Sequence, residues 1–334
     1  MGANGDLRVS DQHQNKPSGE TLETHFATVT NAVLNGRLIP FLGAGVNLCG
    51  NPKAGNWQLG QRLPSGTELS ELLAKKLGYP AADAQDLARV TQYIAVMSGS
   101  GPLYGELRSV FDCDYSPTTA HQFLAALPGL FRAKGLPPKF QLIVTTNYDD
   151  VLERAFRAAN EPFDLVSYVA VGEDRGKFIH WTTKGEMRLI EKPNEYREVT
   201  AEQCTVIVKI HGAIDRANPD RDSFVITEDD YIDYLTRTDI SNLLPITIAA
   251  KLRRSNFLFL GYGLRDWNLR VILHRIWGER RLTYKSWAIQ VAPQPIDMEL
   301  WRKRDVDILD LHMDDYLAQL GERLKQAVKS GGSV

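Results

Sequence analysis

The amino-acid sequence predicts an α/β protein: a Rossmann-like, mostly parallel sheet with helices on both faces and a helical insertion subdomain. Two observations predict this fold. Short apolar runs recur along the chain between glycine-rich or polar turns, as the buried strands of parallel sheets do. Segments with helical spacing separate these runs, and such alternation is typical of an open sheet covered on both faces. A chain of 334 residues is long enough to bury one large core.

The predicted elements follow one another in a regular order. A first helix is expected at Thr21–Asn35, because apolar residues recur there at helical spacing and Gly36 ends the pattern. Further helices are expected at Glu228–Leu235 and Ser241–Arg254, and short strands and turns between residues 164 and 200. The buried strands are expected at Arg37–Leu42, Phe140–Val144, Thr205–Ile210, Asn256–Leu260, Ser286–Val291 and Asp305–Leu311.

Domain boundaries follow from composition. Residues 1–18 are polar and predict a disordered or partner-contacting arm. Residues 19–330 predict one catalytic domain, with a mainly helical insertion at about 48–139 that proline and glycine clusters punctuate. The insertion is expected to act as a lid over the binding pocket or as an oligomer contact, and the sequence does not decide between these roles.

Composition excludes several classes of function. A formal net charge of −2 gives no electrostatic reason to expect nucleic-acid binding. No apolar run reaches the roughly 18 to 20 residues that span a bilayer, and the N-terminus lacks the apolar region of a secretory signal, so we expect a cytoplasmic protein. Cys49, Cys113 and Cys204 lie far apart, which argues against both a cysteine zinc site and a disulfide framework.

Four glycine-rich or polar turns fall at the carboxyl ends of predicted strands, where open α/β sheets bind ligands. They are Gly43–Asn47, Thr145–Asp149, His211–Gly212 and Gly261–Asn268. Each signal is weak by itself. A G-x-G after a strand is more often a plain tight turn, an Asn at a strand end is more often a helix cap, and a lone histidine is usually structural. The convergence of all four is what predicts a binding site.

In order and spacing, the four turns resemble the sirtuins, and above all the sirtuin-like domains of bacterial antiphage systems. That family has G-A-G after its first strand, T/Q-N-x-D after its second and H-G after a later one. The matching segments here are Gly43-Ala-Gly45, Thr146-Asn-Tyr-Asp149 and Lys209-Ile-His-Gly212. The segment from Phe259 to Arg270 is similar to the G-Y-S/G-L-x-D-x-N-L turn of the bacterial branch. The resemblance spans about residues 25 to 325.

The resemblance implies that the chain binds NAD+ and breaks its nicotinamide–ribose bond. Asn147 would bind a ribose hydroxyl or the attacking water, with Asp149 and Thr146 supporting the pocket. His211 would be the base that accepts a proton, and a histidine that titrates near neutrality suits this role. The other residues expected to contact NAD+, at its diphosphate and adenosine, are Gly43, Ala44, Gly45, Asn47, Gly261, Gly263 and Asp266.

Departures from the deacylating sirtuins favour water over acetyl-lysine as the nucleophile. The chain cannot build their four-cysteine zinc module, so no metal is expected. Thr146 stands in place of their Gln, and Asn47 in place of the Ser after G-A-G. The leading hypothesis is therefore an NAD+ glycohydrolase that releases nicotinamide and ADP-ribose. An NAD+-dependent deacylase or ADP-ribosyltransferase, and a non-catalytic NAD+- or ADP-ribose-binding module, remain alternatives.

Resemblance to the defence branch also implies a role as an antiphage effector that depletes NAD+. Such an enzyme must be silent until it is triggered, and the sequence shows no sensor domain after about residue 330. We therefore expect a separate activating partner, such as a HerA-type hexameric ATPase or a short Argonaute. Homo-oligomerisation is expected as a further means of control, and no membrane or nucleic-acid contact is expected.

Overall fold

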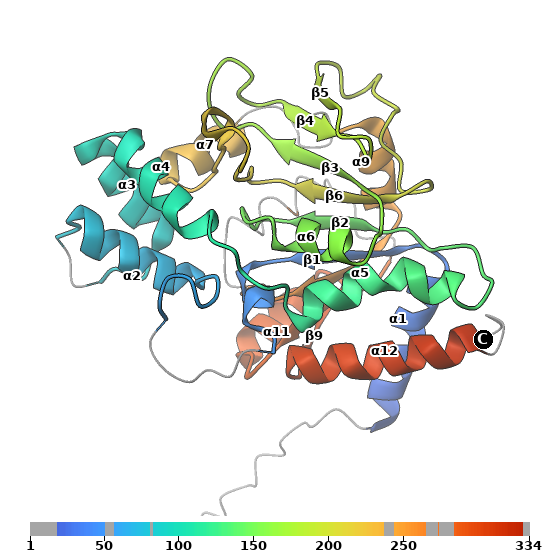
Figure 1. Ribbon diagram of the computed structural model, residues 1–334. Coiled ribbons are helices and arrows are strands. Elements are labelled where there is room, and N and C mark those ends of the chain that lie inside the picture. The colour runs from blue at the N-terminus through green and yellow to red at the C-terminus, as the bar shows by residue number, and fades with distance from the viewer. Residues whose placement is uncertain are drawn as a thin grey trace, which may run out of the picture.

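A nine-stranded sheet forms the centre of the computed structural model, which describes residues 19–50, 57–80, 83–236, 244–264, 273 and 284–329 (Figure 1). The strand order is β5-β4-β3-β6-β2-β1-β7-β8-β9. Seven neighbouring strands, from β3 to β9, run parallel, while β4 and β5 are antiparallel additions at one edge. The predicted fold class, a mostly parallel Rossmann-like sheet, is confirmed.

Six of the seven parallel strands lie where apolar runs predict them, within two residues at each end; the seventh, β3, falls at the start of the region expected to hold short strands and turns. The seven strands are β1 (Leu38–Leu42), β2 (Leu142–Thr145), β3 (Phe163–Tyr168), β6 (Thr205–Lys209), β7 (Asn256–Leu260), β8 (Ser286–Gln290) and β9 (Val306–Asp310). The edge strands are β4 (Phe178–Trp181) and β5 (Met187–Ile190). Both faces of β1, β2, β6 and β7 are buried, which explains why these segments are mostly apolar along their length and do not alternate between apolar and polar residues.

Helices cover the two faces of the sheet, because successive side chains of a strand point to opposite sides. Ile39 and Phe41 of β1 belong to one core, which α7 (Glu228–Thr236), α9 (Ile246–Arg253) and α11 (Pro295–Arg302) cover. Leu38 and Leu42 belong to the other core. That second core is covered by α1 (Gly19–Leu34), α5 (Thr119–Arg132), α6 (Val151–Ala158) and α12 (Met313–Lys329).

A third apolar cluster holds a helical subdomain together. It joins α2 (Gly66–Leu77), α3 (Leu87–Ser98) and α4 (Ser100–Phe111) to Tyr148 and Phe224 of the sheet domain. Figure 1 shows these three helices grouped at one end of the sheet beside α7, which α3 contacts. The fourth helix of the predicted insertion, α5, packs instead on the second face of the sheet. The helical subdomain thus comprises only α2, α3 and α4 and leaves out the last helix of the inserted segment.

The strand order brings the four predicted turns to one edge of the sheet. The neighbours of β1 are β2 on one side and β7 on the other, and β6 follows β2. All four strands are parallel, so their carboxyl ends lie at the same edge. The chain moves to one side of β1 through β2 and returns on the other side through β7, which is the arrangement that opens a ligand crevice in such sheets. Among the described residues, no helix has the length and apolar character needed to cross a bilayer.

Candidate functional site

The turns after β1 and β7, the β1/β7 turn pair (Gly43–Gly45 and Gly261–Tyr262), touch through their main chains. Gly43 N–H donates to the Leu260 carbonyl at 3.0 Å, and Gly45 N–H donates to the Gly261 carbonyl at 2.9 Å. A Cβ on Gly261 would lie 2.2 Å from the Val46 nitrogen, and one on Gly45 would lie 2.7 Å from the Gly261 oxygen. The glycines are therefore required for this contact. Two N–H groups of the G-A-G segment already donate within the protein, and the role of Gly43, Ala44 and Gly45 at a diphosphate stays a prediction.

Asn147 joins the turn after β2 to the turn after β1. Its side-chain Nδ2 donates to the Gly43 carbonyl at 3.3 Å, and its main-chain N–H donates to Thr145 Oγ1 at 3.0 Å. The next link is made by Thr146, whose N–H donates to the Leu42 carbonyl at 3.2 Å. The half-buried Asn147 is thus held at the junction of β1 and β2 and keeps its side-chain oxygen for other contacts.

Asn47 and Asp149 form a second link between the same two turns. Asn47 lies in the short helix η1 (Ala44–Leu48), and its Nδ2 donates to Asp149 Oδ2 at 3.4 Å. The other carboxylate oxygen of Asp149 accepts the Val151 N–H at 3.1 Å, at the start of α6. Both side chains are buried. Two residues predicted from separate motifs, 102 positions apart, therefore lie in contact.

The turns after β2 and β6, the β2/β6 turn pair (Thr146–Asp150 and Lys209–Gly212), are joined by Lys209, which also forms a buried ion pair with α6 that sequence reasoning missed. Lys209 Nζ lies 2.7 Å from Glu153 Oε1, and the two side chains are only 1% and 3% exposed. Lys209 also donates to the main-chain carbonyls of Tyr148 and Asp149. The lysine thereby holds the two residues that follow Asn147. A single charged residue in the apolar run of β6 was the visible signal, because such a residue needs a buried partner.

His211 is enclosed by aromatic rings. It is 3% exposed, and the rings of Tyr231 and Tyr234 meet it edge-on with centroids 5.5 and 5.7 Å away. Burial lowers the pKa of His211 to about 3, so the expectation that it titrates near neutrality is wrong for this state. Its Nε2 has no hydrogen-bond partner among the described residues. His211 is thus a neutral imidazole with a ring nitrogen left for a ligand.

The glycine after His211 has a structural role. Gly212 has φ +86°, and a Cβ there would lie 2.2 Å from the Ser223 carbonyl oxygen. The segment that returns along this turn is fixed by two main-chain hydrogen bonds, from Val225 N–H to the His211 carbonyl and from Ser223 N–H to the Ala213 carbonyl. The H-G pair therefore combines a buried imidazole with a close backbone contact that only glycine allows.

The last predicted turn is described only in part. Gly261 lies in the β1/β7 turn pair, whereas Gly263 is exposed and a Cβ there would meet nothing within 4 Å. Asp266 lies outside the described residues. Tyr262 packs edge-on against Phe41, and its carbonyl accepts a hydrogen bond from Gln290 at 2.8 Å. Gly261 therefore contacts Gly45, and Asn147 contacts Gly43, whereas Gly263 does not join them. His211 is brought to the same edge of the sheet on the adjacent β6.

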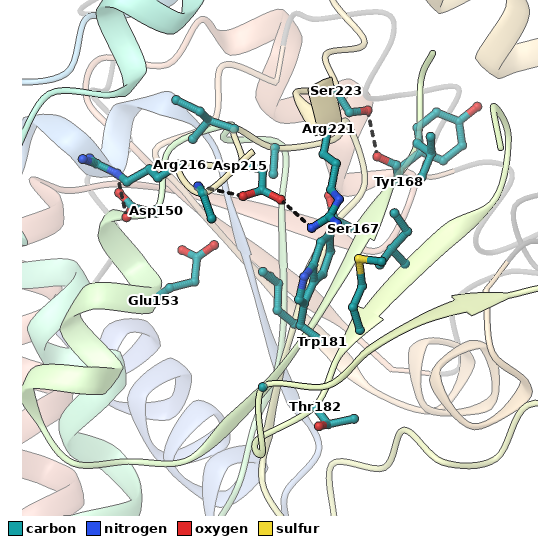
Figure 2. Close-up of a pocket in the computed structure, with 18 of the residues that line it drawn as sticks. Asp150, Glu153, Ser167, Tyr168, Trp181, Thr182, Asp215, Arg216, Arg221 and Ser223 are labelled. Atoms are coloured by element: carbon teal, nitrogen blue, oxygen red, sulfur yellow. Dashed lines mark hydrogen bonds and ion pairs between the residues drawn. The ribbon is translucent and has the colours of Figure 1, made fainter. Parts of the chain in front are cut away.

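Within the described ranges, no group of three or more His, Cys, Asp or Glu side chains is arranged to hold a metal ion. A cavity of about 760 Å³ lies beside α6, β3 and β4 (Figure 2), and none of the predicted site residues lines it. A smaller cavity of about 60 Å³ is lined by Asn47 together with Arg62, Tyr115 and Thr118.

Comparisons with known proteins give one family and two relatives. The model of a family described as "SIR2-like domain" matches residues 141–309, about half of the chain. The chain is 24% identical over 303 residues to "Defense-associated sirtuin 2" of Bacillus subtilis, with 86% of this chain and 25% of that protein covered. It is 28% identical over 250 residues to "NAD(+) hydrolase ThsA" of Enterococcus faecium, with 74% and 41% covered. The chain thus spans between a quarter and about two fifths of the length of these relatives.

Proposed function

This chain belongs to the SIR2-like domain family, and on that premise we propose that it hydrolyses NAD+ to nicotinamide and ADP-ribose. One relative is named an NAD(+) hydrolase, which supports this reaction. The observation that carries the proposal is the pair of hydrogen bonds from Asn147 Nδ2 to the Gly43 carbonyl and from Asn47 Nδ2 to Asp149 Oδ2. They assemble polar groups from two motifs at the carboxyl edge of the sheet, where such folds bind nucleotides.

The proposed reaction asks mainly for positioning. The bond between the nicotinamide nitrogen and ribose C1′ breaks, and its electron pair leaves with the neutral nicotinamide. Water then forms a bond to C1′, and one proton is released. The barrier lies in an oxocarbenium-like ribose, which preorganised dipoles stabilise. The free side-chain oxygen of Asn147 is suited to orient the water or a ribose hydroxyl, since its Nδ2 is already fixed on Gly43.

His211 fits this chemistry as a hydrogen-bond acceptor. With a pKa of about 3 it is neutral throughout the physiological range, so its Nε2 accepts a hydrogen bond from the water or from a ribose hydroxyl. The positive charge that develops on the ribose disfavours a second positive charge on a nearby imidazole. The proton that the reaction releases therefore passes on to solvent. The role of His211 is therefore to align the nucleophile rather than to hold a proton at rest.

The other relative is named a defense-associated sirtuin, which supports a role in defence, and we propose that this chain is an antiphage effector. Loss of NAD+ would be toxic to the host, so the activity must be controlled. We propose that homo-oligomerisation and a separate activator, such as a HerA-type ATPase or a short Argonaute, supply that control.

The test is to incubate the purified chain with NAD+, alone and with candidate activators, and to follow nicotinamide and ADP-ribose by chromatography. Asn147→Ala and His211→Ala, checked for folding, should each reduce the rate at least about 100-fold, as loss of a preorganised polar group does. His312→Ala, at an exposed position just after β9 with β7 and β8 between that strand and β1, is the control for loss of an imidazole and should keep full activity.

The products separate the alternatives. Equal amounts of nicotinamide and free ADP-ribose establish hydrolysis. Acetyl-ADP-ribose formed from an acetylated peptide, or ADP-ribose attached to protein, would replace hydrolysis by deacylation or transfer. NAD+ binding without turnover under every condition would contradict the proposal and leave a binding module.

A further inference from the structure

The cavity of about 760 Å³ lies on the face of β3 and β4 beside α6, and its lining contains none of the residues predicted to bind NAD+. One wall is α6, the floor is β3 and β4, and the opposite wall is the segment Ala213–Ser223 between β6 and α7 (Figure 2). Its volume lies within the range of roughly 300 to 1,000 Å³ that small-molecule sites occupy.

The floor of the cavity is apolar and aromatic. Side chains of β3 and β4 alternate between the buried core and the open face, so Val166 and Phe178 are buried while Leu165, Ile179 and Trp181 line the cavity. All three side chains are half-buried, and Leu165 also packs against the core that α5 and α6 cover. They offer a flat apolar surface next to a polar wall.

The arginines that line the cavity are already engaged. Arg216 Nε lies 3.0 Å from Asp150 Oδ2, and Arg221 pairs with Asp215 at 3.6 Å. The guanidinium of Arg157 lies over the ring of Phe163, 5.6 Å from its centroid. The positive groups of the wall are therefore committed to acids or to an aromatic face, and the cavity is not a site prepared for an anion.

Two nearly buried carboxylates on the wall each have an oxygen to spare. Glu153 uses Oε1 for Lys209, and its Oε2 has no hydrogen-bond partner among the described residues, although the side chain is only 3% exposed. Glu161 pairs with Arg132 through Oε1, and its Oε2 is likewise without a partner there. Figure 2 shows the Glu153 carboxylate pointing into the space between Asp215 and Trp181. A buried acceptor without a donor is costly, so each oxygen calls for a donor from outside the chain.

We propose that this cavity binds a small organic cation whose ammonium or guanidinium group donates to Glu153 Oε2 and whose apolar body lies on Trp181. Such a ligand brings a charged donor to the carboxylate oxygen that no side chain of the wall satisfies. Its apolar body covers the aromatic face of Trp181. The remaining oxygen of Glu161 provides a second acceptor along the same wall.

The proposed site is connected to the Asn147 turn through two side chains. Glu153 pairs with Lys209, which in turn donates to the carbonyls of Tyr148 and Asp149. A cation on Glu153 therefore acts on the residue that holds this turn. This consequence rests on the proposed NAD+ hydrolysis, whereas binding in the cavity does not.

The test is a ligand-observed NMR titration of the whole chain with benzylamine, a protonated amine on an aromatic ring, and with benzyl alcohol, its neutral counterpart. A charge-assisted hydrogen bond should make benzylamine bind at least about tenfold more tightly. Trp181→Ala and Glu161→Gln, which leave the Lys209–Glu153 pair intact, should each weaken benzylamine binding several-fold, and Glu153→Gln should weaken it most. Asn147→Ala should bind as the wild type does.

Three results would overturn the proposal. The first is equal affinity for the amine and the alcohol, and the second is no saturable binding of benzylamine up to about 20 mM, which would assign the two oxygens to water alone. The third is binding that none of the cavity variants alters, since the amine would then lie elsewhere. Because binding is read without NAD+, these results are independent of whether the chain hydrolyses NAD+.

Discussion

The β1/β7 turn pair and the β2/β6 turn pair lie side by side at one edge of the sheet, yet they are held in different ways. In the first, the main chains of Gly43, Gly45 and Gly261 touch and exchange hydrogen bonds. In the second, Lys209 pairs with the buried Glu153 and donates to main-chain carbonyls of the turn. One contact depends on the absence of side chains, and the other depends on the presence of two.

The difference shows where the site is rigid and where it can be adjusted. A backbone contact between glycines leaves no side chain to change, so it sets a fixed geometry for the first turn. A buried ion pair responds to the charges around it, because desolvation raises the pKa of Glu153 while Lys209 opposes that rise. Asn147 is held in both ways. Its side chain donates to the Gly43 carbonyl, and the residues that follow it accept hydrogen bonds from Lys209.

The largest effect is expected from a methyl group placed between the two backbones of the β1/β7 turn pair. Gly261→Ala would put a Cβ 2.2 Å from the Val46 nitrogen at a residue with φ +68°, and neither backbone can yield cheaply. We expect a loss of at least about 4 kcal/mol in the free energy of unfolding, or failure to fold. Urea unfolding followed by circular dichroism measures it.

The matched control for that variant lies two residues further along the same turn. Gly263 is exposed and a Cβ there meets nothing within 4 Å, so Gly263→Ala should change stability by less than about 0.5 kcal/mol. Similar losses in the two variants would mean that the turn rejects alanine for a reason other than contact with β1.

The ion pair of the second turn pair should be the next most sensitive feature. Lys209→Met leaves Glu153 buried without its partner, and breaking a buried pair in this way costs about 3–5 kcal/mol. The double variant Lys209→Met with Glu153→Met removes both charges and should recover most of that stability, as measured by urea unfolding.

Recovery of stability should not restore the reaction. The double variant still lacks the donor to the Tyr148 and Asp149 carbonyls, so NAD+ cleavage should stay below wild type, with kcat reduced more than KM is raised. If stability and kcat both return in the double variant, Lys209 is structural and does not position the Asn147 turn.

Much of the fold could be predicted because buried parallel strands leave a clear trace in sequence. The run from Asn256 to Leu260 is apolar apart from its first residue, and the structure forms β7 over the same five residues. Contacts between strands far apart in sequence follow from the parallel order once the strands are located, which is why Asn47 and Asp149 could be assigned to one site.

The rest depends on contacts that no local pattern reports. His211 and its aromatic neighbours Tyr231 and Tyr234 are separated by about twenty residues, so the low pKa of the histidine could not be anticipated. The partner of Lys209 lies on α6, 56 positions earlier in the chain. The cavity beside β3 and β4 could not be predicted either, since its lining comes from α6, from two strands and from the segment after β6, which only the assembled fold brings together.

Apart from the Gly263 control, the smallest effect per residue is expected from pH, through three buried histidines. Burial lowers the pKa of His211 to about 3 and that of His121 to about 4, and Asp149 and Lys209 are the charges that act most on His121. Burial likewise lowers the pKa of His25 to about 4, and its ring lies among those of Phe26, Trp287 and Tyr316.

Each of these histidines is neutral in the folded state and has an unfolded pKa near 6.5, so the unfolded chain binds more protons as the pH falls. Their stabilising contribution is complete above pH 6.5 and is lost progressively towards pH 3–4. Over the first pH unit below 6.5 we expect a loss of about 1 kcal/mol for each histidine. Urea unfolding at pH 6.5 and 5.5 measures the sum, and His211→Phe, which cannot be protonated, should reduce the difference by about one third. A pH-independent free energy of unfolding across this interval would show that the three imidazoles are not held neutral by burial, and would return His211 to the role of a base that titrates near neutrality.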